Sequence, residues 1–294
     1  MELKEIRKIT VIGSGQMGHQ IAMLCALGGY ETTIQDLKED ELQQADEKLR
    51  GIMNKWVAKG KLSEEAMETA FQRLRFTTDL KEAAQSADFV IEAVVEKLNV
   101  KEQVFKTLEE FAPAHTIFAT NSSTIVNSLL AGVTKRPEKV VNMHFFFPPL
   151  VMDCVEVVMS EQTSEETAQF TLGVCEKINR TGLLLRKEIS GFVANRILGA
   201  LQREAVHLYE EGIADFKDID LICRKALSHP IGPFELMDLS GLDVGYFVME
   251  QRYRETGDPA DKPFASVEEK VKKGELGRKT GRGWYEYNKE EVKS

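Results

Sequence analysis

The chain of 294 residues has few cysteines, no excess of positive charge and no apolar run long enough to span a membrane. Its four cysteines, Cys25, Cys154, Cys175 and Cys223, form no C-x-x-C pair and lie in apolar or amphipathic runs. We therefore expect reduced, buried thiols in a cytoplasmic protein. With 38 Lys and Arg against 47 Asp and Glu, the net charge is −9, which argues against duplex nucleic acid as a partner because that needs a large cationic face.

Other absences concern the ends of the chain and its regularity. The N-terminal segment is too short and too charged for a secretory signal, and the C-terminal EEVKS has no retention or lipidation motif. The chain also lacks internal repeats and low-complexity tracts. Apolar residues make up 43% and charged residues 29%, so we expect a globular protein of two packed domains with no membrane partner.

The first half of the chain alternates short apolar runs with amphipathic stretches. We expect strands at residues 8–12, 31–36, 88–92, 116–120 and 139–143, with 154–159 and 183–186 completing the sheet. Helices are expected at 15–27 and 100–111, and a helical insertion near 38–75 is expected to break at Gly60 and to be capped again at Ser63. This alternation predicts βαβ units and a parallel sheet.

The hydrophobic period changes after about Ser190. Helices are expected at 192–211, 216–227, 233–254 and 266–273. The sequence therefore predicts an α/β fold, with a Rossmann-type doubly wound sheet over residues 1–188 and an all-helical domain over 189–294. The long apolar faces of the helical part, as in residues 192–208, are more than a small domain needs for its own packing.

A nucleotide motif opens the chain. Gly13, Gly15 and Gly18 form G-x-G-x-x-G, with Gln16 and Met17 between the last two, directly after a predicted strand and at the start of a predicted helix. The first glycine permits a tight turn, the second a close approach of the backbone to a pyrophosphate, and the third close packing of helix on strand. The alternative is a glycine-rich turn that binds no ligand.

Asp36 ends the next strand, 18 residues after Gly18. A carboxylate there accepts hydrogen bonds from an adenosine ribose and repels a 2′-phosphate, which favours NAD over NADP. Lys38 lies nearby and keeps NADP open, and Asp36 could also be an ordinary surface turn residue.

A histidine follows the predicted strand 139–143, at the edge of the sheet where ligands bind in open α/β folds. Twelve residues on, Glu156 lies inside an apolar strand, where an unpaired carboxylate is costly. His144 is a suitable partner, because Glu156 would fix one ring nitrogen and leave the other as a base. The alternative is a packed histidine without a catalytic role. The other four histidines form no ligand cluster, so no metal is expected.

These motifs belong to a longer series of blocks. They are VIGSGQMG, VIEAVVE, ATNSST, MHFF, VEVV, GFVANRIL, HPIGPFELMDLSGLD and LGRKTGRGWYEY, in this order from residue 11 to residue 287. With them the chain resembles the L-3-hydroxyacyl-CoA dehydrogenases, including the 3-hydroxybutyryl-CoA dehydrogenases, over nearly its whole length. The resemblance implies NAD-dependent, reversible oxidation of an L-3-hydroxyacyl-CoA to the 3-ketoacyl-CoA, and a homodimer formed through the helical domain.

The resemblance also implies site residues. His144 matches the catalytic base, Glu156 the acid that orients it, Ser123 a serine that contacts substrate and nicotinamide, and Asn195 an asparagine that reaches the substrate. The residues that match positions on the cofactor are Glu96, Lys101 and Lys279.

Coenzyme A is expected to lie on two lysines. Lys59 matches a lysine of the family that meets the CoA nucleotide, and Lys55 shares its helix face by i,i+4 spacing. Two ammonium groups on an acidic protein suit the phosphates of CoA. The alternative, a solvated surface face, fits the spacing equally well.

Three positions depart from the family pattern. Phe147 stands where an asparagine that contacts the cofactor is usual, Asp153 where a lysine is common, and Ile52 where a serine often holds CoA. Two other functions follow as alternatives. One is a gulonate-type dehydrogenase of a free hydroxy acid, which would not need Lys55 and Lys59, and the other is a catalytically impaired cofactor-binding relative, which only Phe147 supports.

Overall fold

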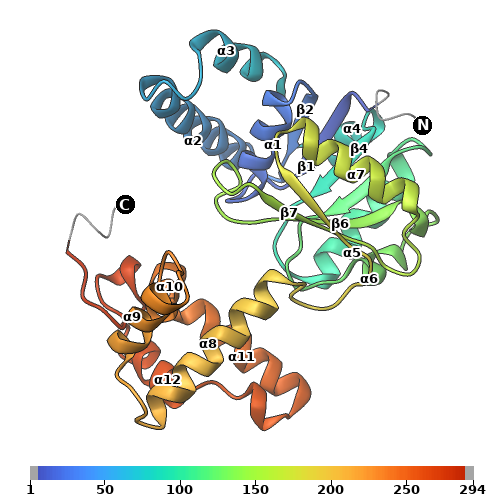
Figure 1. The fold of residues 1–294 in the computed structure, drawn as a ribbon. Coiled ribbons are helices and arrows are strands. Elements are labelled where there is room, and N and C mark those ends of the chain that lie inside the picture. The colour runs from blue at the N-terminus through green and yellow to red at the C-terminus, as the bar shows by residue number, and fades with distance from the viewer. Residues whose placement is uncertain (1–5, 289–294) are drawn as a thin grey trace. The chain divides into compact units, whose positions relative to one another are not determined.

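The computed structural model describes residues 6–288, apart from the side chains of residues 251, 252, 255, 256 and 260. The chain divides after Phe192 into two compact units, and the second unit runs from yellow through orange to red in Figure 1. This division lies a few residues beyond the predicted boundary between 188 and 189.

The first unit contains an eight-stranded sheet in the order β3-β2-β1-β4-β5-β6-β7-β8. The strands are β1 Lys8–Ile12, β2 Glu31–Gln35, β3 Leu74–Thr77, β4 Phe89–Glu92, β5 Ile117–Thr120, β6 Val140–Phe145, β7 Cys154–Val158 and β8 Thr181–Leu185. The strands from β3 to β6 are parallel, as a doubly wound fold requires. The predicted parallel sheet has one exception: β7 runs antiparallel to β6, because residues 146–153 are too few for a crossover helix.

Helices cover both faces of this sheet (Figure 1). They are α1 Gly18–Leu27, α2 Glu39–Ala58, α3 Glu64–Gln72, α4 Leu80–Gln85, α5 Leu98–Phe111, α6 Asn127–Ala131 and α7 Glu165–Lys177. One apolar core gathers side chains of α1, α2, α3 and α7, and another gathers those of α4, α5 and α6. The predicted insertion is present as α2 and α3, and Ser63 caps α3 by accepting a hydrogen bond from Ala66 N at 3.1 Å.

Sequence explains which strands lie at the centre. β4 and β6 are buried at every position, as near-continuous apolar runs covered on both faces should be. β3 is only half-buried at the sheet edge, and its four residues carry too weak a pattern for the sequence to predict it. All four cysteines are free thiols, but the expectation of burial is wrong for Cys154, which begins β7 and is half-exposed.

The second unit is helical over the residues that the structure describes. Its helices are α8 Ala194–Glu210, α9 Phe216–Ala226, α10 Pro233–Ser240, α11 Leu242–Thr256 and α12 Ala265–Lys272. The prediction of one helix over 233–254 is wrong, because Gly241 adopts a φ of +95° between α10 and α11. That conformation interrupts an α-helix, and glycine tolerates it.

Two buried aspartates hold the second unit together. Asp238 accepts hydrogen bonds from Trp284 N at 2.9 Å, Tyr285 N at 2.8 Å and the Tyr287 hydroxyl at 2.9 Å. Asp220 similarly accepts from Phe234 N and from the Tyr285 hydroxyl, both at 2.8 Å. These bonds fasten the C-terminal segment onto α9 and α10.

Between residues 6 and 288, no helix is both long enough and apolar enough to cross a membrane.

Candidate active site

The turn between β1 and α1 has the shape that a dinucleotide needs. Gly13 has a φ of +98°, and a Cβ on it would lie 2.6 Å from the carbonyl oxygen of Ala93. A Cβ on Gly18 would lie 1.8 Å from the carbonyl oxygen of Gly13. Gly15 faces open space, with nothing within 4 Å of the corresponding position. The first and third glycines therefore permit packing, and the second leaves room for a pyrophosphate at the helix N-terminus.

Asp36 lies beside this turn, directly after β2. Its Oδ2 accepts hydrogen bonds from Ser14 N at 2.7 Å and Ser14 Oγ at 2.8 Å, and its Oδ1 accepts one from Leu37 N. Oδ1 keeps a further lone pair for a ribose hydroxyl. Gln16 and Met17 complete the turn into α1, where Gln16 is exposed and Met17 packs against the core. The residues present therefore fit NAD.

His144 and Glu156 face each other across the antiparallel strands β6 and β7. His144 Nδ1 lies 2.9 Å from Glu156 Oε2, and the two residues are only 5% and 3% exposed. The hydrogen bond that the sequence predicted is present. It arises because the reversal at residues 146–153 brings two positions twelve residues apart into direct cross-strand register.

Ser123 lies in the loop that follows β5, next to the strand of His144. Asn121 Oδ1 accepts a hydrogen bond from Phe145 N at 2.9 Å and so ties the ends of β5 and β6 together. Glu96 Oε1 accepts from Ser123 N and Thr124 N, each at 3.1 Å, and also from the Ser122 hydroxyl. Glu96 therefore fixes the conformation of residues 122–124, the serine loop.

A buried ion cluster supports Glu96. Lys101 Nζ lies 2.7 Å from Glu92 Oε1 and 3.2 Å from Glu96 Oε2, and Lys101 is only 1% exposed. Burial alone would raise the pKa of Glu96, but the Lys101 ammonium and the hydroxyls of Ser122 and Thr124 outweigh it and hold that pKa below its ordinary value. Lys101 thus contacts the serine loop through Glu96.

Glu92 is the member of this cluster that the sequence reasoning missed. It ends β4 with no exposed surface, and its Oε2 accepts a hydrogen bond from the Thr120 hydroxyl at 2.6 Å. The same signal that singled out Glu156, a carboxylate inside an apolar strand, was present at residue 92.

The remaining predicted residues lie elsewhere in the two units. Lys55 in the last turn of α2 and Lys59 just after it are exposed at i,i+4 spacing, and Ile52 on the same helix is half-buried. Asn195 lies in the first turn of α8, and Lys279 forms an ion pair with Asp243 Oδ2 at 2.7 Å, both within the second unit. The structure leaves the roles of these four polar residues as predictions.

Two of the positions that depart from the family pattern lie between β6 and β7. Phe147 is 54% exposed, so its ring covers no core. Asp153 is exposed and accepts hydrogen bonds from Thr181 N at 3.3 Å and Thr181 Oγ1 at 2.9 Å, which fixes the start of β8. Asp153 therefore has a structural partner within the sheet.

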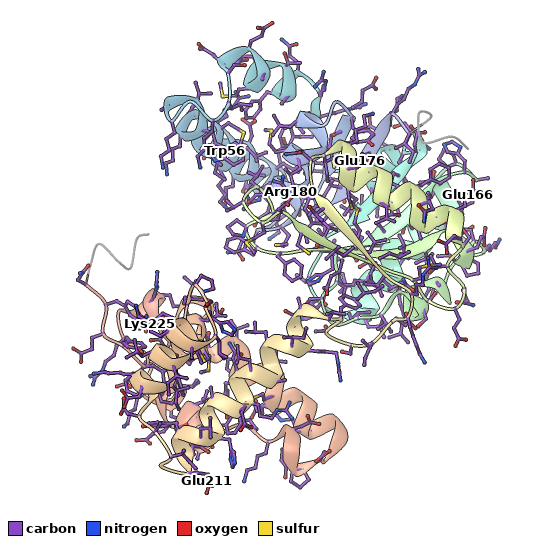
Figure 2. The ribbon with its side chains drawn as sticks, in the orientation of Figure 1. Trp56, Glu166, Glu176, Arg180, Glu211 and Lys225 are labelled. Atoms are coloured by element: carbon purple, nitrogen blue, oxygen red, sulfur yellow. The ribbon has the colours of Figure 1, made fainter. Side chains whose placement is uncertain are left out.

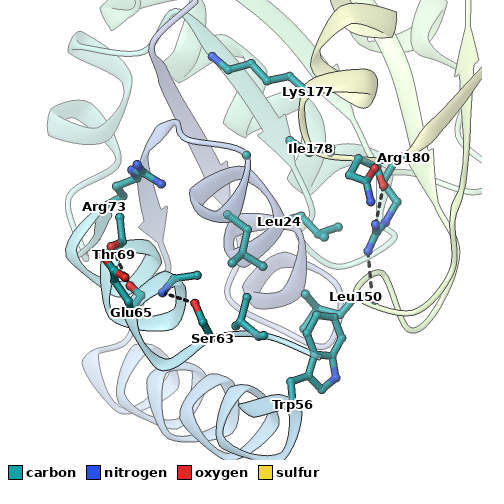
Figure 3. Close-up of a pocket in the computed structure, with 15 residues that line it drawn as sticks. Leu24, Trp56, Ser63, Glu65, Thr69, Arg73, Leu150, Lys177, Ile178 and Arg180 are labelled. Carbon is teal, nitrogen blue, oxygen red and sulfur yellow. Dashed lines mark hydrogen bonds between the residues drawn. The ribbon is translucent and has the colours of Figure 1, made fainter. Parts of the chain in front are cut away.

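A pocket of about 620 Å³ lies in the first unit between α1, α2, α3 and the segment before β8 (Figure 3). Figures 2 and 3 show Trp56 and Arg180 on two of its walls. None of the described residues that line it is a predicted site residue. Arg180 instead donates to the carbonyl oxygens of Pro149 and Leu150, at 3.0 and 2.9 Å, and so anchors the loop that follows β6.

Within the described part of the chain, no three His, Cys, Asp or Glu side chains gather as a metal site would require.

Comparison with known proteins gives the family. Residues 8–189 match the NAD binding domain of 3-hydroxyacyl-CoA dehydrogenase, and residues 191–287 match the C-terminal domain of the same family. A probable 3-hydroxybutyryl-CoA dehydrogenase of Bacillus subtilis is 37% identical over 283 residues, which cover 96% of this chain and 98% of that protein. The mitochondrial hydroxyacyl-coenzyme A dehydrogenase of Homo sapiens is 35% identical over 288 residues, covering 96% of this chain and 91% of that protein.

A solved structure agrees with these relatives. The crystal structure of (S)-3-hydroxybutyryl-CoA dehydrogenase PaaH1 from Ralstonia eutropha superposes with a TM-score of 0.90 at 34% identity, covering 97% of this chain and 100% of that one. With the dinucleotide turn and the buried His144–Glu156 pair in place, the chain belongs to the 3-hydroxyacyl-CoA dehydrogenase family of NAD-dependent oxidoreductases.

Proposed function

We propose that this chain oxidises the hydroxyl of an L-3-hydroxyacyl-CoA to the 3-ketoacyl-CoA, reversibly, with His144 as the general base. The observation that carries this proposal is the 2.9 Å hydrogen bond between His144 Nδ1 and Glu156 Oε2 in a buried position at the sheet edge. Because Glu156 occupies Nδ1, the free Nε2 is the nitrogen that takes the proton of the substrate hydroxyl.

The proton and the hydride leave the substrate carbinol in the same step. Nε2 of His144 accepts the hydroxyl proton, and the Glu156 carboxylate stabilises the imidazolium that forms. When bound, NAD would supply the nicotinamide ring that accepts the C3 hydride. In the reverse direction the imidazolium returns its proton to the developing alkoxide.

The other predicted residues take positioning and binding roles in this proposal. Ser123 and Asn195 hold the hydroxyl and thioester oxygens beside the ring, which lowers the barrier by orientation. Asp36, Glu96 and Lys279 bind the cofactor, and Lys101 acts by holding Glu96.

The CoA nucleotide is proposed to lie on Lys55 and Lys59. Both ammonium groups are exposed, and neither forms an ion pair with a carboxylate of the described residues, so their charge is available to phosphates. The free hydroxy acid of a gulonate-type enzyme would leave both lysines without a function.

We also propose a division of labour and an assembly. Residues 1–188 are the NAD-binding domain, and residues 189–294 are the substrate and dimerisation domain. Large apolar side chains exposed on the second unit support a homodimer, among them Ile197 at 65%, Phe247 at 56% and Ile222 at 55%. A particle of 33.1 kDa in sedimentation at micromolar concentration would contradict it. The free thiols support a cytoplasmic location.

The test is NADH oxidation with acetoacetyl-CoA, a longer 3-ketoacyl-CoA and free acetoacetate, with NADPH as the cofactor control. We expect turnover with NADH and a thioester, and the ratio of the two thioesters defines the acyl pocket. Turnover with the free acid alone would favour the gulonate-type alternative. NADH binding without any turnover would favour an impaired relative and direct attention to Phe147.

A further inference from the structure

The ring of Phe192, the last residue of the first unit, packs against His144. The two ring centroids are 5.5 Å apart with an interplanar angle of 54°, and the ring of Phe146 lies 4.7 Å from the same imidazole at 60°. Phe192 has no exposed surface. The imidazole therefore contacts two phenyl rings, while Glu156 fixes its Nδ1.

The backbone of Phe192 has an uncommon conformation. Its φ is +45°, in the left-handed region, and it follows Gly191 with a φ of +78°. A bulky residue is rarely found there, because its side chain crowds the backbone, and such residues persist where their surroundings hold them. Phe192 N donates a hydrogen bond to the carbonyl oxygen of Ile189 at 3.0 Å, which closes this turn. The strained turn is what delivers the ring to His144.

We propose that Phe192 is a positioning residue for the catalytic base. A single hydrogen bond at Nδ1 leaves the imidazole free to tilt about that bond, and the Phe192 ring removes this freedom. Nε2 then keeps its direction toward the substrate hydroxyl, and water is kept from that side of the ring. The inference rests on the proposed function, since it takes His144 as the base. A proton transfer needs heavy atoms about 2.6–3.2 Å apart, so a small tilt of the ring slows it.

An ordinary core aromatic provides the contrast. Phe105 is also fully buried in the first unit, and its ring contacts Phe118 at 5.9 Å between centroids. It lies inside α5 with helical backbone and has an apolar partner. A Phe105→Ala change also truncates a fully buried phenylalanine to alanine but removes no contact with His144. It is therefore the matched control for Phe192→Ala.

The kinetic test compares Phe192→Ala, Phe192→Gly and Phe105→Ala with acetoacetyl-CoA and NADH. We expect kcat to fall about tenfold in both Phe192 variants, with the thioester KM and the NADH Kd within about twofold of the parent. The primary isotope effect with 4-deuterated NADH should rise as hydride transfer becomes limiting. Glycine tolerates a φ of +45°, so an equal loss in Phe192→Gly assigns the effect to the missing ring and not to backbone strain.

A conservative variant and the control complete this test. Phe192→Leu keeps apolar volume beside the imidazole and should recover part of kcat. If Phe105→Ala lowers kcat as much as Phe192→Ala does, or if Phe192→Gly retains the full rate, the residue is merely structural and the proposal is overturned.

A spectroscopic test does not depend on activity. The chain has only five histidines, so the ring protons of His144 can be assigned by their loss in His144→Gln. We expect ring-current shifts that become smaller in Phe192→Ala, where only the contribution of Phe146 remains, and that are unchanged in Phe105→Ala. Unshifted resonances in the parent would overturn the contact and the proposal with it. Resonances that shift between the parent and Phe192→Ala, in a protein that reduces no thioester, would support the positioning contact and refute the proposed function alone.

Discussion

The two units bury carboxylates in different ways. In the first unit, Glu92 and Glu156 contact groups that carry or accept a proton, Lys101 and His144. In the second unit, Asp220 and Asp238 accept hydrogen bonds from backbone N–H groups and tyrosine hydroxyls, with no ion pair among the described residues. A buried acid with a titratable partner at a sheet edge indicates chemistry, whereas one satisfied by neutral donors fastens chain segments together.

The largest effect is expected for His144→Gln, which removes the proposed base of the first unit. Glutamine retains a hydrogen bond to Glu156 but cannot act as a base at neutral pH, so kcat should fall about a thousandfold. Stopped-flow or steady-state NADH oxidation measures kcat, and fluorescence titration should show an unchanged NADH Kd. A near-normal rate would remove His144 as the base.

In the second unit, a substitution that disturbs the hydrogen bonds of Asp238 should lower the stability of the fold and leave catalysis unaffected. A Cβ on Gly283 would lie 2.1 Å from Asp238 Oδ1, so Gly283→Ala should destabilise this unit by about 1–3 kcal/mol. Gly199→Ala is the control, since nothing lies within 4 Å of its Cβ position in α8, and it should stabilise by about 0.5–1 kcal/mol. The melting temperatures are measured by thermal unfolding followed by Trp284 fluorescence. Equal melting temperatures for the two variants would contradict the prediction.

The ion cluster of the first unit separates stability from function. Glu92→Gln alone leaves the Lys101 ammonium buried with one partner fewer, so this variant should have a lower free energy of unfolding than the parent. The double variant Glu92→Gln, Lys101→Met removes both charges and should regain most of the stability, because neutral replacements of buried ion pairs are tolerated. Its kcat/KM should nevertheless fall about tenfold, because Glu96 loses the Lys101 ion pair that fixes its carboxylate against the serine loop.

The control for the ion cluster is Glu109→Gln. Glu109 Oε2 lies 3.1 Å from Arg136 Nε, and this ion pair includes none of the predicted site residues. Its loss should therefore leave kcat/KM unchanged. A double variant with the parent's kcat/KM would show that the ion cluster is structural, as in the second unit.

Reversing the charge of an exposed lysine should change the kinetics less than the substitutions of buried groups do. Lys59→Glu should raise the apparent KM for acetoacetyl-CoA about threefold to tenfold and leave kcat near its normal value, because the CoA phosphates lie far from the reacting carbon. Lys61→Glu, an exposed lysine two residues away, is the control. Equal KM values for the two variants would mean that Lys59 is merely solvated.

The smallest expected effect is a difference between the two units in the pH at which they unfold in acid. Burial raises the pKa of Asp220 and Asp238, so their ionisation costs stability above that pKa, and the cost disappears as pH falls through it. The lowered pKa of Glu96 gives stability that is present above about 4.3 and lost as pH falls through the folded value. The first unit should therefore unfold at a higher pH than the second.

The two tryptophans allow this to be measured. Trp56 belongs to the first unit and Trp284 to the second, so Trp284→Phe and Trp56→Phe each leave one reporter. We expect the Trp56 fluorescence transition to come first on acidification. Coincident transitions, or Trp284 changing first, would contradict the linkage argument.

Several features of the fold followed from residues adjacent in the sequence. The G-x-G-x-x-G turn, the Ser63 cap and the buried strands are local patterns, and the structure contains them at the expected places. The break at Gly241 and the edge strand β3 did not follow. A helical period continues through a single glycine, and the four residues of β3, three half-buried and one exposed, carry no clear period.

The sequence by itself determined the family, the nucleotide turn and the pairing of His144 with Glu156, because ordered motifs and an acid in an apolar strand are visible without coordinates. Only the tertiary structure decided that β7 runs antiparallel to β6, that Glu92 and Lys101 stand behind Glu96, and that Phe192 packs against the imidazole. These contacts join residues distant along the chain, and their existence depends on strand direction, burial and backbone strain, which sequence spacing does not encode.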